Sequence, residues 1–136
     1  MKPHYNVVAA VVRNNGEILC MQRGPTRFSY TSYKYEFPGG KVEPDETPRD
    51  ALRRELQEEL DLTVGIVCHL LTVHHVYPDF SITMAAYLCD APARTLSLKE
   101  HHNSLWLPAA RLHEPDWAAA DQNIARHLRL HFLARQ

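Results

Sequence analysis

Short apolar runs alternate along the chain with polar segments rich in turn-forming residues. Residues 7–12 are a continuous run of valine and alanine, which predicts a strand buried on both faces. An Asn-Gly turn within residues 14–17 and a second apolar run at residues 18–21 complete a predicted hairpin. A short strand is expected at residues 35–37. Residues 38–40, Pro-Gly-Gly, are expected to turn after it, since glycine adopts backbone angles closed to other residues.

The second half of the chain predicts more strands and a closing helix. Residues 64–76 and 81–89 form a predicted long hairpin, and residues 105–107 a short strand. Residues 118–133 predict a helix, because their apolar positions recur at helical spacing. With one more helix in the middle of the chain, this order predicts an α+β fold, an α/β/α sandwich around a mixed β-sheet. Residues 1–136 fit a single domain.

The middle helix has a sharply defined start. Thr47 is a good N-cap, Pro48 suits the first helical position, and residues 51–60 contain no glycine or proline. At about 100° per residue, Leu52, Leu56 and Leu60 form one stripe that would pack on the sheet.

Three carboxylates, Glu55, Glu58 and Glu59, fall on the face of this helix next to the leucine stripe. Like charges three and four residues apart repel each other, so this arrangement does not serve helix stability. Hard oxygen ligands clustered in this way suit Mg²⁺, with Mn²⁺ as a substitute. Taken alone, the same pattern is also typical of a solvated acidic helix face.

The residues around the helix favour the metal-binding interpretation. Their order is Gly40, five residues, Glu46, seven residues, Arg54-Glu55-Leu56, one residue, Glu58-Glu59, one residue, Asp61-Leu62. This pattern resembles the Nudix box, and it departs from it only at Asp61, where the family has glycine. That position follows the helix and usually takes a left-handed conformation. Aspartate adopts this conformation at a cost on the order of 1 kcal/mol.

The resemblance implies a Nudix fold and a set of metal ligands. Glu55, Glu58 and Glu59 match the family's metal-binding glutamates, and Gly39 matches a residue that offers its backbone carbonyl to the metal. Arg54 is expected to pair with Glu46 and one helix glutamate and so to orient them. In the family the bound metal neutralises a diphosphate and activates a water molecule for attack on phosphorus. Arg54, Glu55 and Glu58 are therefore candidate catalytic residues.

Beyond the box, nearly the whole chain resembles MutT-like and CTP pyrophosphohydrolase-like members of the family. This implies hydrolysis of a nucleoside triphosphate, such as 8-oxo-dGTP or a CTP-type nucleotide, to a monophosphate and pyrophosphate. It also implies a set of substrate-binding residues: Arg23, Glu36, Phe37, Tyr77 and Asp121. Tyr77 has two open roles, stacking on the base or packing the hairpin.

Two further residues carry open alternatives. Asp121 either reads the base edge or caps the last helix. As an ionised acceptor it would favour the amine of cytosine, and as a protonated donor it would accept oxidised guanine. Glu100, six residues before Trp106, matches a loop glutamate that is a metal ligand or a catalytic base in the family. A solvent-exposed glutamate is the alternative.

Other functional classes remain in view. The family also includes hydrolases of ADP-ribose, dinucleotides and nucleotide sugars, as well as non-catalytic nucleotide-binding modules. The intact set of box glutamates favours catalysis over the latter. A net charge of −1 argues against binding to a nucleic acid polymer.

The chain shows no membrane-spanning run and no signal peptide, so we expect a cytoplasmic monomer or homodimer. The cysteines Cys20, Cys68 and Cys89 are expected to be buried free thiols. The adjacent histidine pairs at residues 74–75 and 101–102 are expected to be surface or core residues and not a soft-metal site.

Overall fold

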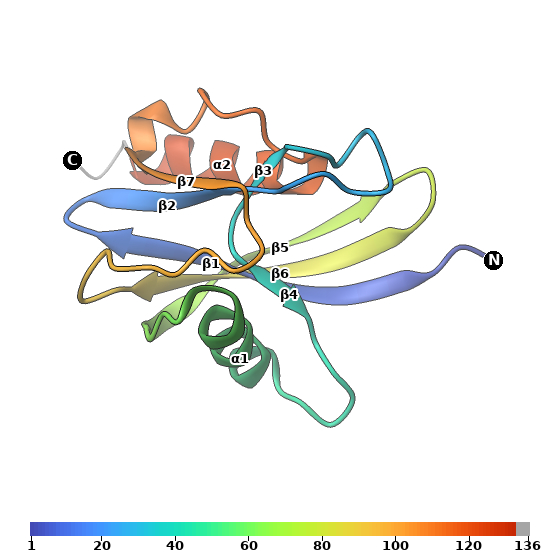
Figure 1. Ribbon diagram of the computed structural model, residues 1–136, viewed down its shortest axis with the longest axis horizontal. Coiled ribbons are helices and arrows are strands. Elements are labelled where there is room, and N and C mark those ends of the chain that lie inside the picture. Colours follow the sequence, from blue (N-terminus) through green and yellow to red (C-terminus); the bar gives the residue numbers. More distant parts are fainter. Residues whose placement is uncertain (133–136) are drawn as a thin grey trace.

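In the computed structural model, which describes residues 1–132, a mixed β-sheet lies between two helices (Figure 1). The elements are β1 (His4–Asn14), β2 (Glu17–Gln22), β3 (Tyr35–Glu36), β4 (Gly39–Lys41), α1 (Pro48–Leu60), β5 (Gly65–Val76), β6 (Ser81–Asp90), β7 (Asn103–Pro108), the 3₁₀ helix η1 (Ala109–Arg111) and α2 (Ala119–Phe132). Leu133, the expected last residue of the closing helix, lies outside the described residues. The predicted α+β sandwich is confirmed.

The sheet places β1 at its centre. The main strand order is β3-β2-β1-β6-β5, with β4 paired to β1 and β7 paired to β2. β1 and β6 run parallel over ten residue pairs, and the other pairings are antiparallel. This central position explains the apolar run of β1, because residues 8–12 are buried between α1 on one face of the sheet and α2 on the other.

Alternate residues of β1 serve the two cores. Val8, Ala10 and Val12 pack in the cluster under α1, and the residues between them pack in the cluster under α2. Figure 1 shows the two helices on opposite faces of the sheet, with α1 below it and α2 above it. The predicted leucine stripe of α1 (Leu52, Leu56 and Leu60) is completely buried. Burial of each leucine stabilises the fold by about 1.5–3 kcal/mol, so this stripe fixes α1 on the sheet.

The expected turn at residues 38–40 is wrong. Gly39–Lys41 instead forms β4, which pairs with β1 so that Ala9 lies opposite Gly39 and Val7 opposite Lys41. A Cβ atom on Gly39 would lie 1.9 Å from the backbone oxygen of Val8. Glycine is therefore needed here because two backbones approach closely, not because the chain reverses.

Both ends of α1 lie where the sequence predicted them. The hydroxyl of Thr47 accepts a hydrogen bond from the backbone N–H of Asp50 at 3.1 Å and caps the helix. Asp61 has a φ of 51°, the left-handed conformation expected after the last helical residue. Its carboxylate accepts a hydrogen bond from Lys99 at 3.0 Å. Asp61 thus ends the helix where the family uses glycine.

The cysteines only partly follow expectation. Cys20 and Cys89 are buried, but Cys68 is exposed. Cys68 lies on the edge strand β5, where a register shift between Ile66 and Cys68 interrupts the regular pairing with β6. Within residues 1–132, no helix is long and apolar enough to cross a membrane.

Candidate active site

The carboxylates of α1 lie against β4. The α-carbon of Gly40 is so close to Glu55 that an added Cβ would lie 2.4 Å from the carboxyl carbon of Glu55. The side chain of Glu55 is 14% exposed, whereas that of Glu58 is 61% exposed. Glu59 is half-buried, and its Oε2 atom is buried without a hydrogen-bond partner. The leucine stripe on the sheet therefore turns the glutamate face of α1 towards the Gly39-Gly40 segment.

Arg54 holds several of these carboxylates at once. Its Nε and Nη2 atoms donate to the two oxygens of Glu46 at 2.7 and 2.9 Å. Its Nη1 atom donates to Glu55 at 2.9 Å and to Glu58 at 3.4 Å. Through its hydrogen bond to Glu46, Arg54 lowers the pKa of that carboxyl to about 2. The expected pairing of Arg54 with Glu46 and a helix glutamate is confirmed, and the paired arginine orients the carboxylates.

Glu59 has an environment that disfavours its negative charge. Burial raises its pKa, and a hydrogen bond and charge from Glu55, together with the charges of Glu36 and Glu100, raise it further. Such a site of crowded, poorly hydrated carboxylate oxygens becomes favourable when a cation neutralises it. The orphaned Oε2 of Glu59 and the hard-oxygen donor set thus fit a divalent ion.

The glutamates do not form a finished ligand cage by themselves. Within residues 1–132, no three His, Cys, Asp or Glu side chains are arranged to hold one ion. Glu55 and Glu58 are engaged by Arg54, and only one oxygen of each takes part in these bonds. The second oxygens of both carboxylates remain available as ligands.

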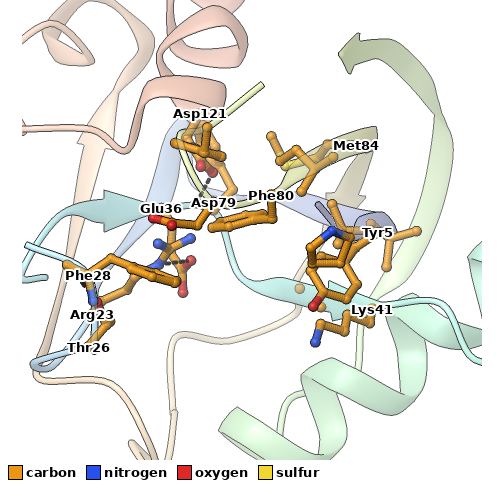
Figure 2. A pocket seen from close by; sticks show the side chains of 18 of the residues that line it. Tyr5, Arg23, Thr26, Phe28, Glu36, Lys41, Asp79, Phe80, Met84 and Asp121 are labelled. Atoms are coloured by element: carbon orange, nitrogen blue, oxygen red, sulfur yellow. Dashed lines mark hydrogen bonds and ion pairs between the residues drawn. The ribbon is translucent and has the colours of Figure 1, made fainter. Parts of the chain in front are cut away.

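A cavity of about 410 Å³ opens beside this cluster and is bordered by Gly39 and Gly40. The substrate-binding residues that the sequence predicted all line it: Arg23, Glu36, Phe37, Tyr77 and Asp121. In Figure 2, Arg23, Glu36 and Asp121 gather on one side, and Tyr5 and Lys41 lie on the opposite side. These residues come from distant parts of the chain, and the fold brings their side chains together around one cavity.

Asp121 is buried at the inner wall of the cavity. It is 4% exposed, and its carboxylate accepts a hydrogen bond from the backbone N–H of Phe37 at 3.0 Å. Burial, and then the charge of Glu36, raises the pKa of Asp121 to about 7. Of its two open alternatives, the N-cap of the last helix is wrong, because α2 begins at Ala119 and Asp121 lies inside the first turn. Its side chain instead bonds across to the segment between β3 and β4.

Tyr77 packs the hairpin, which is one of its two expected roles, and it also borders the cavity. Its ring is 6% exposed, packs against Tyr30 and Phe80, and lines the cavity. Its hydroxyl accepts a hydrogen bond from the backbone N–H of Ala120 at 3.1 Å. Tyr77 therefore fixes the start of α2, and with it Asp121, relative to the hairpin of β5 and β6.

The cavity has further walls that the sequence did not single out. They are aromatic, apolar or cationic side chains: Tyr5, Arg27, Phe28, Lys41, Phe80 and Met84. Phe28 reaches the cavity because its loop is attached to the tip of the β5–β6 hairpin, where Tyr30 donates to Asp79 at 2.7 Å. Only a clustering of aromatic residues in both segments could have indicated this contact.

Glu36 connects the cavity to His101, which was expected from the sequence to be only a surface or core residue. One of its oxygens binds Arg23 at 2.5 Å and the other binds His101 at 2.8 Å. Burial alone raises the pKa of Glu36, but the hydrogen bonds and charges of His101 and Arg23 outweigh it and hold the pKa below its ordinary value. No local sequence signal distinguishes His101 from its exposed neighbour His102.

Glu100 is exposed on the loop before β7. It lies near enough to Glu59 for its charge to raise the pKa of that residue. The backbone N–H of the neighbouring Lys99 donates to the backbone oxygen of Glu59 at 3.3 Å. The structure thus brings Glu100 to the end of α1, on the border of the carboxylate cluster.

Comparison with known proteins agrees with this site. A family model described as NUDIX domain matches residues 2–128. The 8-oxo-dGTP diphosphatase of Escherichia coli is 30% identical over 124 residues, which cover 90% of this chain and 95% of that protein. The CTP pyrophosphohydrolase of Escherichia coli is 44% identical over 94 residues, covering 60% of this chain and 67% of that protein. The solution structure of the E. coli ORF135 protein superposes with a TM-score of 0.82 at 31% identity, covering 98% of this chain and 94% of that one. With a family model that matches residues 2–128 and the box glutamates in place, this chain belongs to the Nudix hydrolase family.

Proposed function

We propose that the protein hydrolyses a nucleoside triphosphate to a nucleoside monophosphate and pyrophosphate, with Mg²⁺ bound and Mn²⁺ as a substitute. The observation that carries this proposal is the single cavity that begins at Asp121 and reaches Gly40, which touches Glu55. A base at the Asp121 end would extend its phosphates towards the carboxylates of α1. The names of the two Escherichia coli relatives, a diphosphatase and a pyrophosphohydrolase of nucleoside triphosphates, support the same reaction.

Nudix hydrolases generally depend on divalent metals. In this chain Glu55, Glu58 and Glu59, with the backbone carbonyl of Gly39, would hold the ion. When bound, the ion neutralises the diphosphate and makes a coordinated water more acidic. Arg54 keeps the glutamates oriented, so little reorganisation is needed when substrate binds. Glu100, on the loop that is bonded to the end of α1, would accept the proton of the attacking water.

The base would lie between Asp121, Arg23, Phe37 and Tyr77. With a pKa of about 7, Asp121 is available both as an acceptor and as a donor near neutral pH. An ionised Asp121 matches the exocyclic amine of cytosine, and a protonated one matches oxidised guanine. We favour a cytidine-type triphosphate or a modified form of it, with 8-oxo-dGTP close behind.

The remaining proposals concern the setting of this activity. Nucleoside triphosphates are held in the cytoplasm, and we propose that the protein acts there as a monomer or homodimer on a small nucleotide. The three glutamates of α1 are all present, and Arg54 bonds to two of them and to Glu46, which argues for catalysis over a binding module. Such a cluster is costly to maintain without a bound cation.

The reaction products test this proposal. The protein is incubated with Mg²⁺ and a panel of natural, methylated, hydroxylated and oxidised nucleoside triphosphates in ¹⁸O-water, and the products are separated by chromatography. We expect monophosphate and pyrophosphate, with the label in pyrophosphate because water attacks the β-phosphorus. Nucleoside diphosphate and orthophosphate would contradict the proposal, and label found only in the monophosphate would place the attack at the α-phosphorus.

A further inference from the structure

His101 joins the loop before β7 to the wall of the cavity. Its Nε2 atom lies 2.8 Å from an oxygen of Glu36, whose other oxygen binds Arg23. The side chain of His101 is 5% exposed. An ionised carboxylate only accepts hydrogen bonds, so Nε2 carries the proton and donates. The carboxylate of Glu36, on β3, thus connects Arg23, directly after β2, with the loop before β7.

The free-energy cost of burying His101 indicates that its hydrogen bond to Glu36 has a role in the protein. The other ring nitrogen, Nδ1, is buried without a hydrogen-bond partner. An unpaired buried polar atom costs free energy that an apolar side chain of similar shape would avoid. A residue that served only to fill space would be better replaced by leucine or phenylalanine. Unlike these apolar side chains, histidine supplies a hydrogen-bond donor, Nε2, to Glu36 at this position.

The same loop is tied to α1 and β2 on both sides of Glu100. The backbone N–H of Ser97 donates to Leu60 at 3.0 Å, and that of Lys99 to Glu59 at 3.3 Å. After His101, the backbone N–H of His102 donates to Gln22 at 2.8 Å. Glu100 is therefore held between two backbone anchors, and the side chain of His101 supplies a third anchor directed into the protein.

We infer that His101 is a positioning residue for hydrolysis: by donating to Glu36 it fixes the loop that carries Glu100 beside Glu59. Glu36 also binds Arg23, so His101 and Glu36 connect the loop of Glu100 to Arg23, the residue proposed to border the base. The part of this inference that concerns turnover rests on the proposed function. The part that concerns the loop and the binding of a divalent ion does not.

The test compares two amide side chains of different length. In His101→Gln the amide nitrogen reaches approximately the place of Nε2, whereas in His101→Asn it falls short of Glu36. His102→Leu is the matched control, because His102 is the exposed neighbour, whose ring packs in a T-shaped arrangement with Tyr33. The measurements are kcat and KM, Mn²⁺ affinity of the nucleotide-free protein by calorimetry, and amide hydrogen exchange of residues 97–102.

We expect His101→Asn to lower kcat about 10- to 100-fold, as loss of a residue that orients a metal site does, with a much smaller change in KM. Its Mn²⁺ affinity should fall, and the amides of Lys99 and His102 should exchange faster. His101→Gln should restore all three properties to near the wild-type level, and His102→Leu should leave them unchanged.

Three results would overturn the inference. The first is wild-type turnover and Mn²⁺ affinity in His101→Asn, and the second is a raised KM in that variant with an unchanged kcat. The third is an equal loss of kcat in His101→Asn and His101→Gln. Equal losses would show that the imidazole shape matters and not its donor. If the wild-type protein releases pyrophosphate from no nucleotide, the proposed function fails. The Mn²⁺ and hydrogen-exchange comparisons then still decide the role of His101.

Discussion

Gly40 and Glu55 lie in contact: a Cβ atom at Gly40 would meet the carboxyl carbon of Glu55 at 2.4 Å and both of its oxygens within 2.6 Å. The contact joins β4 to α1 at the point where the cavity reaches the carboxylate cluster. Residue 40 must therefore lack a side chain so that Glu55 can lie beside the cavity.

This contact predicts different effects for the two neighbouring glycines. In Gly40→Ala the obstructed atoms are the flexible end of Glu55, so the fold should adapt at little cost while the carboxylate is displaced. We expect kcat to fall about 100-fold, the order of loss that a displacement of about 1 Å produces. The melting temperature should change little. Steady-state kinetics and thermal unfolding of the same preparation measure both effects.

Gly39→Ala is the contrasting variant. Its Cβ would meet the backbone oxygen of Val8 at 1.9 Å, and a strand backbone cannot move aside as a side chain does. We expect a loss of about 1–3 kcal/mol in the free energy of unfolding, as for other overpacked sites. Gly24→Ala, with nothing within 4 Å of the added atom, is the control. A Gly40→Ala variant with normal turnover would show that the position of Glu55 is not critical.

A second prediction concerns Glu58. Glu58→Gln keeps the shape of the side chain but removes its charge, and the proposed reaction depends on charge held by the carboxylate cluster. We expect the fold to be retained and kcat to fall at least ~100-fold. Glu114→Gln, which neutralises a surface carboxylate bound to Arg111, should leave kcat unchanged. Near-normal turnover of Glu58→Gln at saturating Mg²⁺ would rule out the proposed site.

A third prediction follows from the burial of Asp121, which raises its pKa from 3.8 to about 7. Between these pH values the folded protein binds a proton that the unfolded chain has released. The free energy of unfolding therefore falls as pH rises through this interval, and the full cost is present above about pH 7. Asp121→Asn removes this cost. The melting temperature of Asp121→Asn minus that of the wild type should thus increase from pH 5 to pH 8. If the melting temperatures of the two proteins change with pH in parallel, the raised pKa of Asp121 is contradicted.

The same variant tests the reading of the base. A buried polar group left unpaired costs about 1–3 kcal/mol, which corresponds to a ten- to hundredfold preference. We expect Asp121→Asn to change the ratio of kcat/KM between cytosine and 8-oxoguanine nucleotides by this order, without changing the metal dependence. If the ratio stays constant, Asp121 only supports Phe37, and the base is recognised by the aromatic residues of the 24–34 loop, with Phe28 the first to test.

The sequence alone determined helix α1 almost completely. The capping by Thr47, the buried leucine stripe, the shared face of the glutamates and the ion pair of Arg54 with Glu46 all agree with prediction. The cap, the leucine stripe and the glutamate face depend on spacing along one helix, where helical geometry dictates which side chains meet. Apart from β4, the order of strands and helices follows the period of apolar residues and was predictable for the same reason. The pairing of Arg54 with Glu46, which precedes the helix, was implied by the resemblance to the Nudix box.

Other features were decided only by the tertiary structure. Gly39 lies in β4 and not in a turn because β1 passes beside it, and Asp121 bonds to Phe37 because α2 is placed over the sheet. His101 and His102 are indistinguishable in sequence, yet one is buried against Glu36, 65 residues away, and the other is exposed. Burial and partnership across such distances depend on how the layers pack, and local periodicity carries no information about that packing.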